Sequence, residues 1–136
     1  MILLTPDIRF ALRANDINRR AAQRDGKPEP DPVPLLKLFN PLGAATWLAT
    51  ELAEDGDALF GLADLGFGCP ELGYFSLSEI AAVRLPYGMG IERDIDFETP
   101  LPLSRWADSA RRAGAIVLAE TLLRRGAANE LPPSSG

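Results

Sequence analysis

The 136-residue sequence contains no histidine, one cysteine and two lysines. The lack of imidazole excludes Ser-His and Cys-His nucleophilic catalysis, histidine acid-base chemistry near neutral pH, and histidine-bound zinc. The single thiol, Cys69, excludes an internal disulfide and an all-thiolate zinc site, and it agrees with a reducing compartment. Any catalysis would therefore depend on carboxylates, hydroxyls, arginines and the two lysines.

The sequence also lacks a long apolar run. No stretch approaches the ~18 apolar residues that a membrane span requires. The first residues, Met-Ile-Leu-Leu-Thr-Pro-Asp, have neither the basic region nor the apolar core of a signal peptide. We therefore expect a cytoplasmic protein without a membrane partner. With 46% apolar and 24% charged residues, the chain fits one domain, expected at residues 1–127, followed by a disordered tail at 128–136.

The net charge of −5 is unevenly distributed. Residues 31–98 carry three bases and twelve acids, whereas the segments on either side are slightly basic. An acidic centre disfavours the phosphate contacts that nonspecific nucleic-acid binding needs. Nucleic-acid binding stays open as a second alternative, through a basic patch of C-terminal arginines: Arg111, Arg112, Arg124 and Arg125.

The N-terminal part of the chain predicts a helix followed by a linker. Thr5-Pro6-Asp7 combines an N-cap residue, a proline suited to the first helical position and an acid near the positive helix end. Asp16 is expected to cap a second short helix that ends near Gly26. Four prolines prevent any helix over residues 26–34, which we expect to form an extended linker.

Apolar and alternating runs predict an antiparallel meander of four to five strands within an α+β fold. Residues rich in Gly, Pro, Asn and Asp separate these runs and are typical of turns. The strands are expected at residues 33–39, 44–52, 58–65, 72–75 and 91–97.

Two further helices are expected after the fourth strand, one in the middle of the chain and a long one near its end. Ser76 and Glu79 have the spacing of a capping box, which predicts a middle helix that starts there, runs through Ile80 and Val83, and stops before Pro86. Ser104 is expected to cap the C-terminal helix over residues 105–125, in which Gly114 is a weak point.

The turns also predict which residues face each other across the sheet. The turn at 54–57 would place Glu51 opposite Phe60, Ala49 opposite Leu62 and Trp47 opposite Asp64. The loop at 66–71 would place Asp64 opposite Gly73 and Leu62 opposite Phe75. One sheet face would then collect Trp47, Ala49, Phe60, Leu62 and Phe75, and the other Leu48, Leu52, Leu59, Leu65, Leu72 and Tyr74. Because both faces are apolar, we expect either helices on both sides or a homodimer.

Acidic side chains provide the candidate for a metal or acid-base site. Glu51 and Asp64 lie at the rim of the predicted sheet and Glu71 follows in the next loop. Oxygen ligands of this kind suit Mg²⁺ or Mn²⁺. The alternative function is therefore a metal-dependent hydrolase or nuclease that uses Glu51, Asp64 and Glu71. We favour the simpler interpretation, in which these acids cap turns and solvate the rim and no cofactor is bound.

The loop at 66–71 and the two tryptophans have structural interpretations. Gly66-Phe-Gly68 is followed by neither a third glycine nor the Lys-Ser/Thr of a phosphate-binding loop. No imidazole can activate Cys69, so we expect a packed thiol rather than a nucleophile. Trp47 and Trp106 are expected to anchor the core.

Several motifs occur in order along the chain: Lys37-Leu-Phe39, Gly43-Ala-Ala-Thr-Trp-Leu-Ala-Thr-Glu-Leu52, Phe60-Gly-Leu-Ala-Asp-Leu-Gly66, Pro70-Glu-Leu-Gly-Tyr74, Ser76-Leu-Ser-Glu79 and Glu92-Arg-Asp94. Over about residues 1–115 the sequence resembles the bacterial family catalogued as domain of unknown function 2958. The resemblance implies no activity. Because the family's members resemble small proteins of plasmids and other mobile elements, it implies a role in the upkeep, transfer or defence of such an element.

We therefore expect a noncatalytic binding or accessory protein of a mobile element, acting through contacts with another protein or with its own copy. A sharper version of this hypothesis has the acidic surface occupy the basic nucleic-acid site of a host defence protein and so inhibit it. The expected binding residues are Trp47, Glu51, Asp64, Glu71 and Tyr74.

Overall fold

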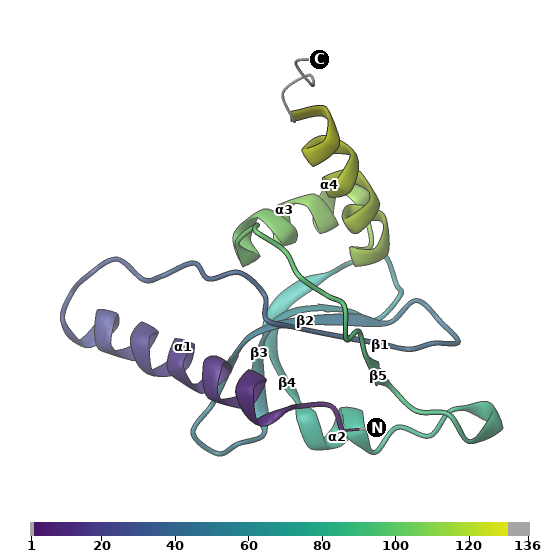
Figure 1. Ribbon diagram of the computed structural model, residues 1–136, viewed down its shortest axis with the longest axis horizontal. Coiled ribbons are helices and arrows are strands. Elements are labelled where there is room, and N and C mark those ends of the chain that lie inside the picture. The colour runs from purple at the N-terminus through teal and green to yellow at the C-terminus, as the bar shows by residue number, and fades with distance from the viewer. Residues whose placement is uncertain (1, 131–136) are drawn as a thin grey trace, which may run out of the picture.

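The computed structural model describes residues 2–130, with side chains described for residues 2–126. One antiparallel sheet, in the order β4-β3-β2-β1-β5, carries helices on both faces (Figure 1). The predicted α+β fold is confirmed. The elements are α1 (Pro6–Arg24), β1 (Leu36–Phe39), β2 (Thr46–Leu52), β3 (Ala58–Asp64), β4 (Glu71–Ser76), α2 (Leu77–Ala81), the 3-10 helix η1 (Pro86–Gly88), β5 (Glu92–Arg93), α3 (Leu103–Ala113) and α4 (Ile116–Glu130).

Helix α1 begins as its sequence predicts but is longer than expected. Thr5 is the N-cap, its Oγ1 accepts a hydrogen bond from the Ile8 N–H at 3.2 Å, and Pro6 is the first helical residue. The prediction that Asp16 caps a second helix is wrong. Asp16 lies inside one continuous helix, where arginines surround its buried carboxylate.

Strands β2 and β3 pair as predicted near their connecting turn and are shifted by one residue beyond it. Glu51 lies opposite Phe60, as predicted, but a β-bulge follows at Thr50. The other predicted pairs are therefore wrong: Ala49 lies opposite Gly61 rather than Leu62, and Trp47 opposite Ala63 rather than Asp64.

Gly61 allows the close approach of the two strands beside the bulge. A Cβ atom at Gly61 would lie 1.8 Å from the Leu48 carbonyl oxygen, so no other residue fits there. A glycine inside a predicted strand is thus the sequence signal for this irregularity.

Helix α1 replaces β1 as the neighbour of the second half of β2. β1 begins only at Leu36, three residues later than the predicted start at residue 33, and the linker predicted at residues 26–34 forms neither helix nor strand. The Asn15 side chain donates to the Thr50 carbonyl at 2.9 Å, and Arg13 donates to the Leu52 carbonyl at 2.7 Å. These side chains satisfy backbone acceptors that would otherwise lack a strand partner.

The predicted pairing of β3 with β4 is wrong by three residues. Gly73 lies opposite Gly61 rather than Asp64, and Phe75 lies opposite Leu59 rather than Leu62. Pairing ends early because the Asp64 carboxylate accepts from the Gly66 N–H and turns the chain away from the ladder.

The sheet separates two hydrophobic cores. One core includes Leu12 of α1 and Ile80 of α2, and the other includes Ile116 of α4 and the side chains of α3. Trp47 and Trp106 are buried in the first and second core respectively, which confirms their predicted role. Because the register shifts are odd, four residues lie on the faces opposite to those predicted: Leu52, Leu59, Phe60 and Leu62.

The predicted C-terminal helix is divided in two at Gly114, whose φ of 83° ends α3 in the left-handed region. The prediction that Ser104 is the N-cap is wrong, because Pro102 takes that position. The Ser104 N–H instead donates to the Asp31 carboxylate of the proline-rich segment at 3.2 Å. α4 includes the first residues of the predicted tail, and residues 131–136 lie outside the described part of the chain.

The middle helix and the last strand are shorter than predicted. The Ser76 Oγ accepts from the Glu79 N–H at 3.1 Å, which confirms the predicted cap of α2. The strand expected over residues 91–97 is limited to β5, because the Asp94 carboxylate accepts from the Asp96 N–H and forms a turn. No helix within residues 2–130 is long and apolar enough to cross a membrane.

Candidate protein-binding site

The three acids of the predicted metal site lie in separate environments. Glu51 is bound to α1, Asp64 is buried beneath the β3–β4 loop, and Glu71 is exposed at the start of β4. Among the described residues, no three acidic or cysteine side chains come close enough to hold a metal ion. The structure therefore does not bring Glu51, Asp64 and Glu71 together.

Asp64 joins the β3–β4 loop (residues 65–70) to the start of α4. Its side chain is fully buried, Oδ1 accepts from the Gly66 N–H at 2.9 Å, and Oδ2 accepts from the Ile116 N–H at 2.9 Å. A carboxylate at this position satisfies a free helix N–H and interacts favourably with the helix dipole. Asp64 thus fixes the base of the loop against α4.

A buried ion network fixes α1 against β2. Arg19 Nε donates to both Glu51 oxygens, at 3.0 and 2.9 Å, while Asp16 pairs with Arg13 at 2.7 Å and with Arg20 at 3.1 Å. Burial raises the pKa of Glu51 above its usual value, although the Arg19 hydrogen bonds act against this. Burial acts in the same direction on Asp16, but the bonds from Arg13 and Arg20 outweigh it and lower the pKa of Asp16.

Two apolar side chains on β4 are exposed, in addition to Glu71. Tyr74 is 59% exposed, and its ring packs edge-on against Phe60 with the centroids 5.1 Å apart. Arg19 donates to the Tyr74 hydroxyl at 3.4 Å, which connects the ion network to β4. Leu72 is 39% exposed on the same face of the strand.

Exposed apolar side chains lie at the tips of two neighbouring hairpins. Phe67 and Leu65 in the β3–β4 loop are 83% and 57% exposed, and Leu42 in the β1–β2 turn is 49% exposed. The tips touch, since a Cβ at Gly66 would lie 3.5 Å from the Ala44 Cβ. Leu42, Ala44, Leu65 and Phe67 are termed the hairpin-tip surface. Contiguous exposed apolar residues of this kind are typical of interaction sites.

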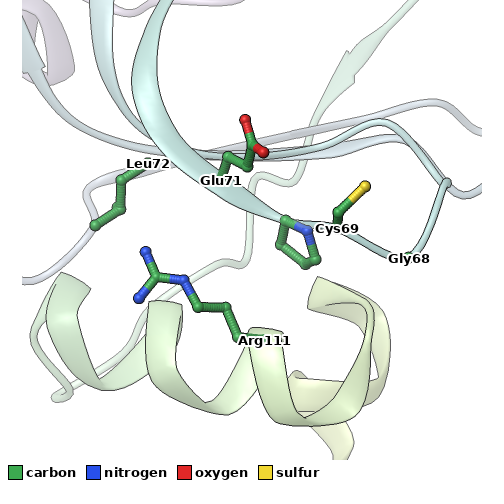
Figure 2. A pocket seen from close by; sticks show the side chains of 6 residues that line it. Gly68, Cys69, Glu71, Leu72 and Arg111 are labelled. Atoms are coloured by element: carbon green, nitrogen blue, oxygen red, sulfur yellow. The ribbon is translucent and has the colours of Figure 1, made fainter.

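A cavity of about 540 Å³ opens beside the β3–β4 loop at the start of β4 (Figure 2). In Figure 2 the Arg111 side chain extends from α3 toward Leu72, and the Glu71 side chain points to the other side of the strand. Cys69 is exposed, so the prediction of a packed thiol is wrong. The cavity is lined by Gly68, Cys69, Pro70, Glu71, Leu72 and Arg111.

The arginines of the nucleic-acid alternative lie on exposed helix faces. Arg112 pairs with Asp108 at 3.2 Å, and Arg124 pairs with Glu120 at 3.1 Å. Each acid offsets part of the positive charge that phosphate binding would use. Arg111 borders the cavity described above, and Arg125 is exposed on α4.

The sequence of this chain matches a family profile over residues 3–117, which is most of its length. The family is described as protein of unknown function (DUF2958). The chain belongs to this family. The resemblance expected from the sequence motifs is thereby confirmed, and the match ends close to the expected boundary at residue 115. No curated protein and no solved structure matches the chain.

The sequence of this DUF2958 member did not identify the hairpin-tip residues as candidates. The sequence pattern places Leu65 on a sheet face and Phe67 in the loop at 66–71, and it gives neither residue a role in binding. The available signal is Gly66-Phe-Gly68, because the two glycines have φ values of 91° and 83° that turn the chain sharply on either side of Phe67.

Proposed function

We propose that this chain is a noncatalytic binding protein that contacts another protein through the hairpin-tip surface. The observation that supports this most strongly is Phe67, which is 83% exposed on a loop whose base Asp64 holds. Leaving a phenylalanine in water forgoes about 2 kcal/mol of burial free energy. A protein partner that covers Phe67 would recover it.

The shape and charge around Phe67 support a partner of a particular kind. The cavity beside the loop is bounded by Leu72 and Arg111. A partner carboxylate would pair with the Arg111 guanidinium at the border of this cavity. The expected partner surface is therefore an apolar recess for Phe67 with an acidic residue at its rim.

The environment of the acids supports binding over catalysis. Glu51 is engaged by Arg19, and Asp64 is engaged by two backbone N–H groups. A hydrolase that used these carboxylates would have to release both from their partners. Glu71 alone would remain, and one carboxylate is a poor magnesium site.

Affinity capture from a host-cell lysate tests the proposal with three immobilised proteins: the wild type, Phe67→Asn and Tyr87→Asn. Tyr87 is 93% exposed in η1, so its variant removes an exposed aromatic residue outside the hairpins. We expect the wild type and Tyr87→Asn to retain the same protein, and Phe67→Asn to bind it at least about tenfold more weakly, as for a central interface residue. Equal retention by all three proteins would contradict the proposal.

A further inference from the structure

Strand β4 forms one edge of the sheet, and the pattern of its hydrogen bonds can be assigned. The Leu77 N–H donates to the Asp57 carbonyl at 3.0 Å and so extends the β3–β4 ladder by one bonded pair. In an antiparallel ladder, bonded and non-bonded pairs alternate. Glu71, Gly73 and Phe75 therefore bond to β3, whereas Leu72, Tyr74 and Ser76 direct their backbone N–H and C=O groups outward.

A second bond supports this assignment. The Ala53 N–H donates to the Ala58 carbonyl at 2.8 Å, which directs Ala58 toward β2 and away from its β4 neighbour Ser76. Within residues 2–130, the outward backbone groups of Leu72 and Tyr74 have no backbone partner.

The exposed side of β4 has none of the features that keep sheet edges apart. Such edges usually carry lysine, proline, a bulge or a cover. β4 contains no lysine or proline, its pairing with β3 shows no bulge, and its one charged residue is Glu71 at the first position. A Cβ at Gly73 would meet nothing within 4 Å, so the middle of the strand is open.

We infer that β4 pairs antiparallel with β4 of a second copy of this chain, about a twofold axis at Gly73. In this register Leu72 of each copy faces Tyr74 of the other, and because both residues direct their backbone groups outward, each pair can exchange two hydrogen bonds. The same surface serves on both chains, as a closed twofold dimer requires. The two exposed apolar side chains, Leu72 and Tyr74, then cover one another across the joint.

Neighbouring registers are less complementary. A shift that places Leu72 opposite itself puts Pro70 opposite Tyr74 of the copy, and proline has no N–H to donate. A shift in the other direction places Glu71 opposite Leu77 of the copy, and Leu77 belongs to α2 rather than to the strand. In the Gly73-centred register Glu71 lies opposite Phe75 of the copy, so the two glutamates are at opposite ends of the joint and do not repel each other.

The dimer leaves the hairpin-tip surface free. The β3–β4 loops precede β4 in each copy, so antiparallel pairing places them at opposite ends of the joined strands. The dimer would present two hairpin-tip surfaces, and a partner with two binding sites would gain affinity through linkage. The pairing does not depend on that partner's existence.

Disulfide trapping tests the register directly. In a Cys69→Ser background, Gly73→Cys places two thiols at the twofold axis, where a non-bonded antiparallel pair has Cα atoms about 4.5 Å apart, within disulfide range. We expect a covalent dimer on mild oxidation at low protein concentration. The control is Ile95→Cys in the same background, an exposed position beyond the opposite edge, which should stay monomeric under the same conditions. No covalent dimer from Gly73→Cys would overturn the register.

Sedimentation equilibrium tests the edge itself. We expect the wild type to have a mass near twice the 14.7 kDa of one chain, and the mass to fall to one chain on dilution. Leu72→Pro removes an outward N–H together with the leucine side chain, but no bond to β3, and should shift the dissociation constant by tenfold or more, with an unchanged circular dichroism spectrum. Leu72→Lys keeps the N–H, adds two like charges at the joint and should act in the same direction, whereas Ile95→Lys should not.

Two results would overturn the inference. One is a monomeric wild type at every accessible concentration, which would leave the edge to an extended segment of a different protein. The other is a dimer that survives both Leu72 variants, which would place the contact elsewhere. Lysate capture tests the proposed function, and the mass of the dimer tests this inference. A Phe67→Asn protein that loses capture but still dimerises would show that the two are independent.

Discussion

The two edges of the sheet differ in length, charge and cover. β5 has two residues, Glu92 and Arg93, both charged. Arg93 donates to the Ile2 carbonyl at 2.9 Å, which ties the N-terminal segment across this edge. β4, in contrast, has six residues, and two of the three that direct their backbone groups outward, Leu72 and Tyr74, carry apolar side chains, while the third, Ser76, ends the strand.

Because of this difference, the β5 edge of the sheet is closed, meaning protected from pairing with another strand, and the β4 edge is open to such pairing. Short length, charge and a covering segment are the usual protections of an edge, and β5 combines them. β4 is longer, its one charge is Glu71 at the first position, and within the described residues no backbone segment pairs with its outer side. We therefore assign association to β4 and protection to β5, and the following predictions alter one side at a time, from the largest expected effect to the smallest.

The largest effect is expected for Arg19→Met, on the side of the open edge. The change leaves the Glu51 carboxylate buried without its partner, which costs about 3 kcal/mol of unfolding free energy near neutral pH. Arg24→Met is the matched control on the same helix, because the Arg24 side chain is 75% exposed. Urea unfolding of both variants measures the difference.

The loss caused by Arg19→Met should depend on pH. Burial already raises the pKa of Glu51, and removal of Arg19 raises it further. The destabilisation is present above this pKa and disappears as the pH falls through it, because Glu51 then takes up a proton and carries no charge. Equal destabilisation at about pH 7 and pH 4 would contradict the role given to this pair.

Asp64→Ala is expected to cost about 2 kcal/mol, because it leaves the Gly66 and Ile116 N–H groups without their acceptor. Asp64→Asn keeps one carbonyl oxygen and should cost about half as much. Both variants should also weaken lysate capture, since the loop that carries Phe67 loses its anchor. Unchanged urea unfolding of Asp64→Ala would show that Asp64 does not hold the loop.

Lys37→Met should lower the free energy of unfolding by about 1 kcal/mol, because it removes ion pairs beside the β5 edge. Lys37 Nζ lies 2.8 Å from a Glu120 oxygen and 3.5 Å from an Asp94 oxygen, and its side chain is 12% exposed. Amide exchange should become faster at Glu92 and Arg93, while the dimer mass stays the same. A loss of association in this variant would contradict the separate roles of the two edges.

The smallest effect concerns acid stability at the end of β4. The Ser76 hydroxyl and the Ser78 N–H lower the pKa of Asp57. The stability that this contributes is present above the unfolded pKa of about 4, and is lost as the pH falls through the lower folded value. Asp57→Asn should therefore unfold with a flatter pH profile than the wild type in acid. Parallel profiles would show that Asp57 contributes nothing here.

Local signals in the sequence were sufficient to predict the helices and strands and several of the residues at which they begin or end. Thr5 and Pro6 start α1, and Ser76 starts α2, because each depends on residues within one helical turn. The apolar runs identified the strands and both tryptophans of the core, because these too depend on residues that are close together in the sequence. The runs alone also predicted that both sheet faces need a cover, from helices or from a second copy, and in the structure helices pack on both faces.

The errors arose where distant parts of the chain meet. The bulge at Thr50 depends on Gly61 in the next strand and on Asn15 of α1. Asp64 was read as a rim acid because its acceptor role involves Ile116, which lies far along the chain. These contacts shift the register by odd steps and so decide which side chains are covered. Tyr74 is among the binding residues expected from the sequence, whereas the exposure of Leu72 and of the hairpin-tip surface followed only from the structure.

Amide hydrogen exchange at Leu72 and Tyr74 as a function of protein concentration tests the central claim most directly. The account predicts that both amides are protected in concentrated solution and exchange rapidly after dilution, while the amides of Glu92 and Arg93 do not change with concentration. Rapid exchange of Leu72 and Tyr74 at every concentration would contradict it.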